Sequence, residues 1–534
     1  MAETLKTDVL VVGAGPAGSV IAARLAAAGR RVLLIEQGPR HGDALRRELL
    51  DRRRQRLGPD DFSDHVPADF KNPTVAPASP RPWYYLSASG VGGATLHWGG
   101  HTPRPTAEDL RFRTLFGRGR DWPISYDELE PWLLEAEREL GVSANDDNPY
   151  ASPRSGPFPM PAHAPSYFEQ SVLAPGLGRL GWTAHTRPNA VASTPYRGRS
   201  ACLACRACSV CPSGARYSAD RVHVPLLVDQ PTGTLRAGLK LRRLEVGKDG
   251  RRVTAAHCVR LEDRGEVVIE AGTVVLAQNA VETPRMLLLS ADDRHHRAGL
   301  GNAGGQLGRG FSDHFMTFFW FELDREVGRG LPYSSMNCER FRGKADRDRR
   351  GTFSINFLPM PVEWDWVPPF MMQDLAVQGD RLTLAELRRG FTRGVLGYGI
   401  HEHGGDGTLA LDPVQRDGFG DPLARVALVP SEWDRAGLDL LEQLRADLAG
   451  VLRARRSWSY WSRGESFFAS HPSGAAAMGR SPETGVCDRN ARVFGLDNLY
   501  VAGSAVFPHQ GAANPTLTIV ALALRLASHL GAPS

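Results

Sequence analysis

The sequence predicts an α/β fold in which a Rossmann-like nucleotide-binding unit opens the chain. Residues 8–12 are a short apolar, β-branched run, and a glycine-rich turn over 13–18 follows them directly. An alanine- and leucine-rich stretch over 19–28 has the pattern of a helix, and residues 31–36 predict a second strand that ends in an acid. A strand, a helix and a second strand of this size are typical of a parallel βαβ unit.

The length of the chain and the change in residue pattern along it predict more than one domain. With 534 residues, the chain is long enough for two or more domains. Residues 470–534 return to a strand–loop–helix pattern and are predicted to complete the nucleotide-binding domain that residues 1–310 begin. Aromatic and polar side chains are mixed over 311–469, which predicts a separate second domain. The overall class is therefore α+β, with a discontinuous first domain.

The charge balance argues against some classes of partner. The chain carries 64 basic and 59 acidic residues, and this net charge of +5 is too even to indicate a nucleic-acid or membrane partner. Residues 1–6 lead straight into a strand without a signal peptide, and no apolar run reaches the ~18 residues that span a bilayer. We therefore predict a cytoplasmic protein with no membrane span, while export together with a partner that carries its own signal stays open.

The glycine-rich turn predicts a dinucleotide site. Gly13 allows the tight turn, Gly15 lets the backbone approach a pyrophosphate, and Gly18 lets helix and strand pack closely. The N-terminus of the following helix offers free N–H groups and a partial positive charge to the phosphates. Glu36 ends the second strand, where a carboxylate accepts hydrogen bonds from ribose hydroxyls and repels a 2′-phosphate. The pattern disfavours NADP but does not separate FAD from NAD.

Four further segments carry a resemblance to a known family: 90–100, 121–132, 274–285 and 498–525. With them the chain resembles the glucose–methanol–choline (GMC) oxidoreductases nearly from end to end. The resemblance implies FAD as the cofactor and a Rossmann-like FAD-binding domain formed by residues 1–310 and 470–534. It also implies a substrate-binding domain over 311–469 built on an antiparallel sheet, similar to that of p-hydroxybenzoate hydroxylase.

The resemblance also implies which residues contact the cofactor. Beyond the glycine-rich turn and Glu36, they are Gly92, Gly93, Thr95, His97, Gly503, Asn514, Pro515 and Thr516. In pyranose oxidases a His-Trp pair at the place of His97 carries a covalent bond to the flavin, whereas other branches with His-Trp bind FAD noncovalently. Leu96 stands where that oxidase has Thr, so both modes of attachment stay open for His97.

The chemistry of alcohol oxidation predicts a catalytic pair near the end of the chain. Hydride transfer to flavin N5 requires the hydroxyl proton to leave as well, and a neutral imidazole is the usual acceptor. By the family pattern the base position falls on His471 and its partner position on Asn514. A His/Asn pair is similar to that of the sugar-oxidising branch, such as pyranose oxidase. The plain alternatives are a structural core histidine at 471 and a helix cap at 514.

Three more residues are candidates for contact with the substrate. His509 lies in the loop before the last helix, and it either contacts the substrate or is an ordinary loop residue. Trp364 and Trp366 form an aromatic loop that suits a sugar ring, and ordinary domain packing explains them equally well. Three acids near this loop leave room for a cationic amino sugar: Glu363, Asp365 and Asp374.

Four of the seven cysteines are packed into one short segment: Cys202, Cys205, Cys208 and Cys211. Thiolates at this spacing suit one soft metal centre, and the final Cys-Pro is similar to ferredoxin sequences. The stretch resembles FAD-dependent glucose, gluconate and sorbitol dehydrogenases, some of which hold a [3Fe–4S] cluster that relays electrons to a cytochrome partner. The spacing of the last pair differs from theirs. A [3Fe–4S] or [4Fe–4S] cluster, free or disulfide-bonded structural cysteines, and zinc all stay open.

The resemblance implies FAD-dependent oxidation of a hydroxyl group of a sugar or glycoside to a carbonyl. A small-molecule alcohol is then the substrate, and an electron acceptor or O₂ reoxidises the flavin, with a small or cytochrome partner subunit as one such acceptor. Two alternatives stay open, namely a tailoring oxidase for an aminoglycoside or other natural-product hydroxyl, and a GMC enzyme for a non-sugar alcohol. A third is an electron-transfer subunit without alcohol chemistry, and His471 argues against it.

Overall fold

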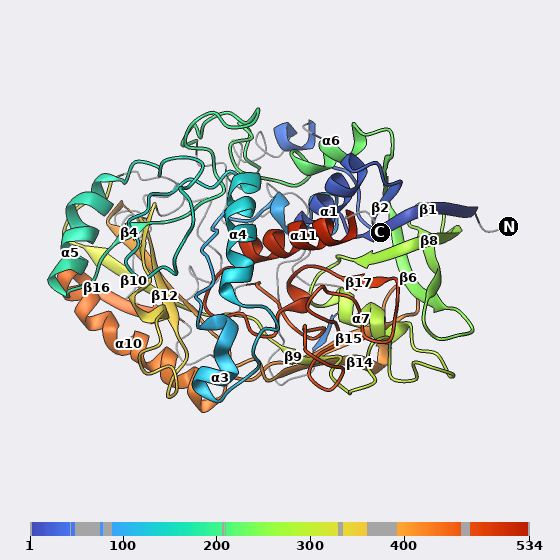
Figure 1. Cartoon of the computed structure of the whole chain (residues 1–534). Helices are drawn as coiled ribbons and strands as arrows, with labels where there is room; N and C mark the ends of the chain where they lie inside the picture. Colours follow the sequence, from blue (N-terminus) through green and yellow to red (C-terminus); the bar gives the residue numbers. More distant parts are fainter. Residues whose placement is uncertain are drawn as a thin grey trace.

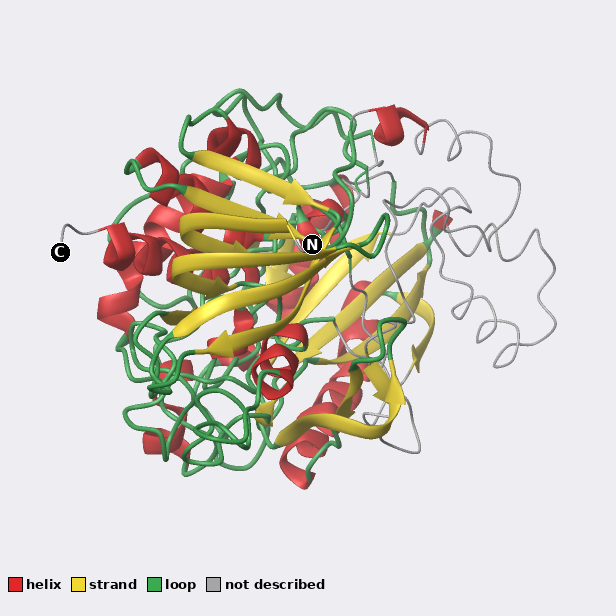
Figure 2. Ribbon diagram, turned by 90° about the vertical axis from the view of Figure 1, so that its right-hand side faces the viewer, coloured by secondary structure: helices red, strands yellow, loops and turns green. Residues whose placement is uncertain are grey.

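The computed structural model describes residues 3–42, 44–48, 75–77, 88–205, 208, 210–328, 335–359, 392–460 and 470–531. The predicted substrate residues Trp364 and Trp366, with the three acids near them, lie outside the described residues. Over the described part of the chain, the strands form three sheets, with helices packed along them (Figure 1). Figure 2 shows that the strands of different sheets run in different directions.

The first sheet combines strands from the first and the last segments of the chain. Its strands, in spatial order, are β5 (Gly233–Ala237), β2 (Val32–Glu36), β1 (Glu3–Val12), β8 (Glu266–Leu276), β7 (Val253–Arg260) and β6 (Leu239–Val246), and β17 (Leu499–Val501) also pairs with β8. β1 lies parallel to β2 and β8, and β17 lies parallel to the last residues of β8. The predicted strands over 8–12 and 31–36 are confirmed, and β17 is the strand of the strand–loop–helix pattern predicted over 470–534. The first strand begins earlier than predicted, because β8 pairs with it from Glu3 to Val12.

Three helices pack together beside this sheet and join the first segment of the chain to the last. The helices α1 (Pro16–Ala27), α11 (Thr516–Gly531) and α4 (Tyr126–Leu140) pack against one another in that order (Figure 1). α4 begins at a capping box, in which the Ser125 hydroxyl accepts from the Glu128 N–H and the Glu128 carboxylate accepts from the Ser125 N–H. The helix predicted over 19–28 is confirmed, and α11 is the helix of the strand–loop–helix pattern predicted over 470–534.

The second sheet is antiparallel throughout. Its strands, in spatial order, are β16 (Ala454–Tyr460), β10 (Phe315–Leu323), β13 (Gly394–His401), β12 (Phe353–Pro359), β11 (Met336–Cys338) and β4 (His185–Thr186). The helix α10 (Glu432–Leu452) packs along one face (Figure 1), where Phe319, Phe321 and Phe353 are fully buried. The opposite face is not covered by α10. Five of these strands come from the predicted substrate region, and β4 comes from earlier in the chain.

The remaining elements connect the two large sheets. A third sheet has the order β3 (Val75–Pro77), β15 (Pro422–Ala427), β14 (Gly407–Arg416) and β9 (Arg309–Phe311). The shorter helices are α3 (Phe112–Phe116), α5 (Ala174–Arg179), α6 (His223–Val228) and α7 (Glu282–Leu289), together with 3-10 turns such as η1 (Gly93–Leu96). Among the described helices, none has the length and apolar character needed to cross a membrane.

Candidate active site

A cavity of about 430 Å³ lies where β1, β2 and β8 end and α1 and α11 begin. Most of the predicted cofactor residues line it, and so does the predicted base His471: Gly13, Gly15, Glu36, Gly93, Thr95, His97, Gly503, Asn514, Pro515 and Thr516. Ligands of parallel α/β sheets bind in this position, beyond the carboxyl ends of the strands. Gly18, Gly92 and His509 are not part of the lining.

The glycines of the first turn have distinct physical roles. Gly13 has φ +102°, and a Cβ there would stand 2.7 Å from the Ala277 carbonyl oxygen. A Cβ on Gly18 would stand 1.9 Å from the Gly13 carbonyl oxygen, so a side chain would push α1 away from β1. Gly15, in contrast, has no atom within 4 Å of such a Cβ, and it faces the cavity. The backbone is therefore open to a ligand at Gly15.

Glu36 is held at the edge of the cavity by backbone donors. Its carboxylate accepts hydrogen bonds from the N–H groups of Ala14 at 3.0 Å and Gly38 at 2.9 Å. Burial raises the pKa of this carboxyl to about 7, although the backbone N–H groups act in the opposite direction. A carboxylate fixed in this way at the end of the second strand is suited to accept hydrogen bonds from ribose hydroxyls.

A second loop closes over the first turn. Gly92 and Gly93 have φ values of +114° and +54°, and a Cβ on Gly93 would stand 2.9 Å from the Cα of Gly15. The Gly92 N–H donates to the Ala14 carbonyl oxygen at 2.9 Å, which docks the loop on the turn. The hydroxyl of Thr95 donates to the Gly92 carbonyl oxygen at 2.5 Å and accepts from the Ala219 N–H at 3.0 Å. These bonds place His97, the next residue after η1, in the cavity wall.

The lining as a whole fits FAD. Gly15 and Gly503 leave open space beside the backbone, and the first turns of α1 and α11 both line the cavity. No side chain caps the N-terminus of α1, so its N–H groups are available to a pyrophosphate. Within the described chain, the buried Oε1 of Gln278 and Oδ1 of Asn514 have no hydrogen-bond partner. Buried polar atoms normally have partners, and a polar cofactor would supply them here.

The predicted catalytic pair is brought together in this cavity. The Nδ2 of Asn514, just before α11, lies 3.1 Å from the Nε2 of His471. The backbone N–H of His471 donates to the Asp313 carboxylate at 2.8 Å, which fixes the position of the histidine in its loop. The amide nitrogen and the imidazole nitrogen are therefore within hydrogen-bond distance of each other in the cavity wall.

A hydrogen-bond relay fixes the tautomer of His471. The Nε2 of His314 lies 2.9 Å from the Gly511 carbonyl oxygen, which only accepts, so Nε2 of His314 carries the proton. The Nδ1 of a neutral His314 is then an acceptor, and it lies 3.0 Å from Nδ1 of His471. His471 must therefore donate from Nδ1, and its Nε2 keeps a lone pair directed at Asn514 and the cavity.

Burial keeps both histidines of the relay neutral. Burial lowers the pKa of His471 from 6.5 to about 4. The pKa of His314 lies well below its ordinary value, first because the ring is buried and then because His471 is close to it. At neutral pH, His471 is thus an unprotonated imidazole beside an amide donor, which is the state that a general base requires.

His509 belongs to a buried ionic network behind the cavity. Its Nε2 lies 2.5 Å from the Glu402 carboxylate, and its ring stacks on Phe112 with centroids 3.7 Å apart. Arg347 forms ion pairs with Glu402 and with Asp109 in the same network. Burial opposes the charge of Glu402, but Arg347 and the hydrogen bond from His509 outweigh it and hold the pKa below its ordinary range. The His509 ring is thus already bonded to Glu402 and stacked on Phe112.

Comparisons with known proteins agree with this geometry. A family model described as GMC oxidoreductase matches residues 7–316, and a second one with the same description matches residues 405–523. The chain belongs to the GMC oxidoreductase family. Members are FAD-dependent oxidoreductases that act on CH–OH groups, so the predicted fold class, family and enzyme class are confirmed.

Three relatives of this GMC oxidoreductase match it over nearly their full length. The fructose dehydrogenase large subunit of Gluconobacter japonicus is 28% identical and covers 98% of this chain and 98% of its own. The 2-methyl-1,2-propanediol dehydrogenase of Mycolicibacterium austroafricanum is 29% identical, with 98% and 95% covered. The 6'''-hydroxyparomomycin C oxidase of Streptomyces lividus is 28% identical, with 98% and 92% covered.

The cysteine segment of this GMC oxidoreductase forms a partly exposed loop. Cys205 is exposed, Cys202 and Cys208 are half-buried, and Cys211 is buried. All seven cysteines are described and all are free thiols, so the disulfide alternative has no support. Around a single zinc ion the sulfurs would lie about 4 Å apart, and no three of these described sulfurs lie within 4.8 Å of one another. The geometry therefore does not favour zinc.

Three residues of the cavity region could not be predicted from the sequence. His314 stands next to the first residue of β10, far along the chain from His471, and no spacing rule relates the two positions. His101 and Arg187 both line the cavity, yet each looks like an ordinary polar loop residue in the sequence.

Proposed function

We propose that this GMC oxidoreductase oxidises a hydroxyl group of a sugar or glycoside to a carbonyl, with His471 as the general base. The observation that carries the proposal is the Nε2 of His471, kept deprotonated by the relay through His314 and facing Asn514. Relatives that act on fructose and on a paromomycin derivative support a carbohydrate substrate.

The pair acts on the hydroxyl of the bound substrate. FAD, held by Glu36, the N-terminus of α1 and the loop that carries His97, supplies the hydride acceptor. A substrate hydroxyl that replaces the direct contact of the pair donates to Nε2 of His471 and accepts from Nδ2 of Asn514. With a pKa of about 4, His471 is a weak base, so proton transfer accompanies loss of the hydride, when the hydroxyl becomes strongly acidic. The bond from Nδ1 to His314 then helps to carry the new positive charge.

A substrate panel tests the proposed class. The protein with FAD bound is mixed under nitrogen with sugars, glycosides, choline, a sterol and a long-chain primary alcohol, and the loss of flavin absorbance is followed. We expect the fastest bleaching with a member of the carbohydrate group. Faster bleaching by an alcohol without a polyhydroxylated ring or chain would favour the other branch, of which the 2-methyl-1,2-propanediol dehydrogenase is an example.

The pH dependence of flavin reduction is expected to reflect the burial of His471. The ring stays neutral down to a pKa of about 4, so the rate should hold between pH 8 and 5 and fall only as the pH approaches about 4. Stopped-flow reduction at saturating substrate measures this profile. A midpoint near the ordinary histidine value of 6.5 would show that the base is exposed, or that another group is the base.

The accessory features remain proposals. The family implies FAD. An iron–sulfur cluster at Cys202, Cys205, Cys208 and Cys211, a covalent flavin bond at His97 and a small or cytochrome partner subunit stay open alternatives. The choice between O₂ and another electron acceptor stays open, and the cytoplasmic location stays a prediction. Iron and acid-labile sulfide analysis of freshly purified protein tests the cluster: we expect about three or four irons per flavin. One flavin with no iron would remove the cluster.

A further inference from the structure

Arg187 is a buried cation that the fold leaves unpaired. It directly follows β4, it is 6% exposed, and it lines the same cavity as His471. Within the described part of the chain, no carboxylate forms an ion pair with it, and its Nε is buried without a hydrogen-bond partner. A buried charge without a partner is strongly unfavourable, so its persistence here indicates a ligand that supplies the partner.

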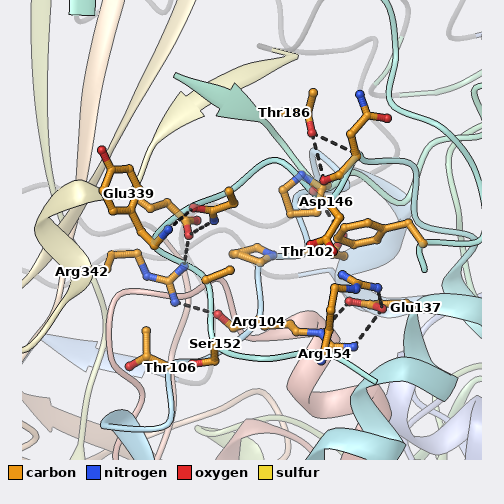
Figure 3. Close-up of a pocket in the computed structure, with 17 residues that line it drawn as sticks. Thr102, Arg104, Thr106, Glu137, Asp146, Ser152, Arg154, Thr186, Glu339 and Arg342 are labelled. Atoms are coloured by element: carbon orange, nitrogen blue, oxygen red, sulfur yellow. Dashed lines mark hydrogen bonds and ion pairs between the residues drawn. The ribbon is translucent and has the colours of Figure 1, made fainter. Parts of the chain in front are cut away.

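The other buried arginines are engaged, which makes Arg187 distinctive. Over the described chain, four of them pair with carboxylates: Arg46, Arg285, Arg342 and Arg347. Arg216 donates to the carbonyl oxygens of Leu96 and Trp98. Figure 3 shows the same pattern in the neighbouring pocket, where Arg342 meets Glu339 while Arg104 and Arg154 meet Glu137.

Buried polar side chains with unused hydrogen-bonding atoms lie in the cavity wall with Arg187 and on the strands next to it. His101 lines the cavity and is 4% exposed, and neither of its ring nitrogens has a partner among the described residues. His185 pairs with Asn337 across β4 and β11, and Asn337 pairs with Asn356 across β11 and β12. All three are buried, and each has at least one polar atom that no described residue bonds.

The row of polar side chains formed by His185, Asn337 and Asn356 lies on the face of the second sheet that α10 does not cover. Its neighbours Cys338 and Ile355 pack into the core beneath α10, and side chains alternate between the faces along a strand. His185 and Arg187 are two residues apart, and the backbone of Arg187 continues the pairing of β4 by donating to the Ser335 carbonyl oxygen at 2.8 Å. The row and Arg187 therefore lie on the same side.

The described carboxylates near the cavity already have hydrogen-bond or ion-pair partners. Of the carboxylates in the lining, Glu36 accepts from backbone N–H groups, and Glu282 lies 3.2 Å from Arg285. The Asp313 carboxylate accepts from the N–H groups of His314 and His471. The described wall around His471 therefore presents an unpaired positive charge, which favours an anionic ligand over the cationic amino sugar considered from the sequence.

We propose that Arg187 binds a carboxylate of the substrate, and that the substrate is a polyhydroxy acid, that is, a sugar acid in open-chain or ring form. The inference rests on the proposed function and names its substrate class. A guanidinium binds a carboxylate through two parallel hydrogen bonds, which fixes orientation as well as charge. The unused ring nitrogens of His101, which lines the same cavity, then serve a substrate hydroxyl, while His471 takes the proton.

Two matched sets of compounds test the proposal. D-gluconate, D-glucitol and 1-amino-1-deoxy-D-glucitol share one polyol chain and differ only in an anionic, neutral or cationic end group. The methyl glycosides of glucuronic acid, glucose and 6-amino-6-deoxyglucose form the equivalent ring set. Anaerobic flavin reduction gives kcat/KM for each. We expect the acid to lead its set by about 30-fold or more, since a buried charge pair of this kind contributes strongly to binding.

Variants assign this preference to Arg187. In Arg187→Gln the acid should lose about 30-fold or more in kcat/KM while the neutral compound changes little, and Arg187→Lys should recover part of the loss. Arg325→Gln, which removes an exposed charge paired with Asp324, is the matched control and should change neither. FAD content and sulfite affinity of the flavin are measured for each variant.

The outcomes separate this inference from the function on which it rests. If the neutral or cationic member leads both sets, or if Arg187→Gln leaves the preference unchanged, the carboxylate site is wrong while sugar oxidation stands. An equal loss for all members, with altered sulfite affinity, would assign Arg187 to the flavin and overturn the proposal. If no member of either set, and no carbohydrate of the wider panel, reduces the flavin, the proposed function itself fails.

Discussion

Replacing His471 with Ala is expected to slow flavin reduction by about 10²–10⁴-fold, the usual contribution of a well-placed base, while FAD stays bound. The relay from Gly511 through His314 leaves Nε2 of His471 unprotonated, with its lone pair facing the cavity. Ala removes this nitrogen, the group that accepts the hydroxyl proton. The cofactor contacts at Glu36 and the first glycine turn are separate from this residue. Stopped-flow absorbance under nitrogen measures the rate, and the flavin content of the purified variant reports cofactor binding.

His257 provides a matched control for this variant. It lies on β7, pairs with Glu245 at 2.8 Å, and is not part of the cavity lining, so His257→Ala should reduce flavin at the wild-type rate. His314→Phe keeps a ring but removes the acceptor for Nδ1 of His471, and it should give an intermediate loss. Wild-type rates in His471→Ala with a full complement of FAD would show that another group removes the proton.

Replacing Glu402 with Gln is expected to lower the free energy of unfolding by about 3–5 kcal/mol, because it leaves a buried cation with a weaker partner. Glu402 is fully buried and pairs with Arg347, accepts from the Thr352 N–H at 3.0 Å, and meets His509 at 2.5 Å. Asp109 remains beside Arg347 but cannot replace a carboxylate that holds three elements together. Thermal and urea unfolding of the purified variant measure the change.

Glu135 gives the matched control for an exposed ion pair. It pairs with Arg24 at 2.6 Å, but both side chains are more than one-third exposed, so Glu135→Gln should cost at most about 1 kcal/mol. The contrast between the two Glu→Gln changes isolates the effect of burial. If Glu402→Gln unfolds at the same temperature as Glu135→Gln, the network of Arg347, Glu402 and His509 does not support the fold as described.

The nucleotide-binding unit was predictable because its signals are local. The turn at Gly13, the close approach at Gly18 and the acid at Glu36 each follow from a conformational or chemical demand within a stretch of about 30 residues. The same holds for α4, whose capping box begins it at Ser125. His471 and Asn514 were reached through the family resemblance, and the structure places them 3.1 Å apart.

The remainder depends on contacts between distant parts of the chain. β4 has only two residues, too few for any periodic pattern, and becomes a strand because β11 pairs with it. The same pairing brings Arg187 to the cavity. His314 acquires its role from Gly511 and His471, neither of which is near it in sequence. His509 was a candidate for substrate contact, and its partner Glu402 could not be identified from the sequence.

The most direct test of the central claim is a single-turnover experiment on the holoenzyme. The protein with FAD bound is mixed anaerobically with an excess of an oxidisable sugar or sugar acid, and flavin absorbance and carbonyl product are measured together. Alcohol oxidation with His471 as the base predicts one carbonyl formed for each flavin bleached in the wild type, and bleaching slowed by about 10²–10⁴-fold in His471→Ala. Bleaching without carbonyl formation, or at an unchanged rate in the variant, would contradict it.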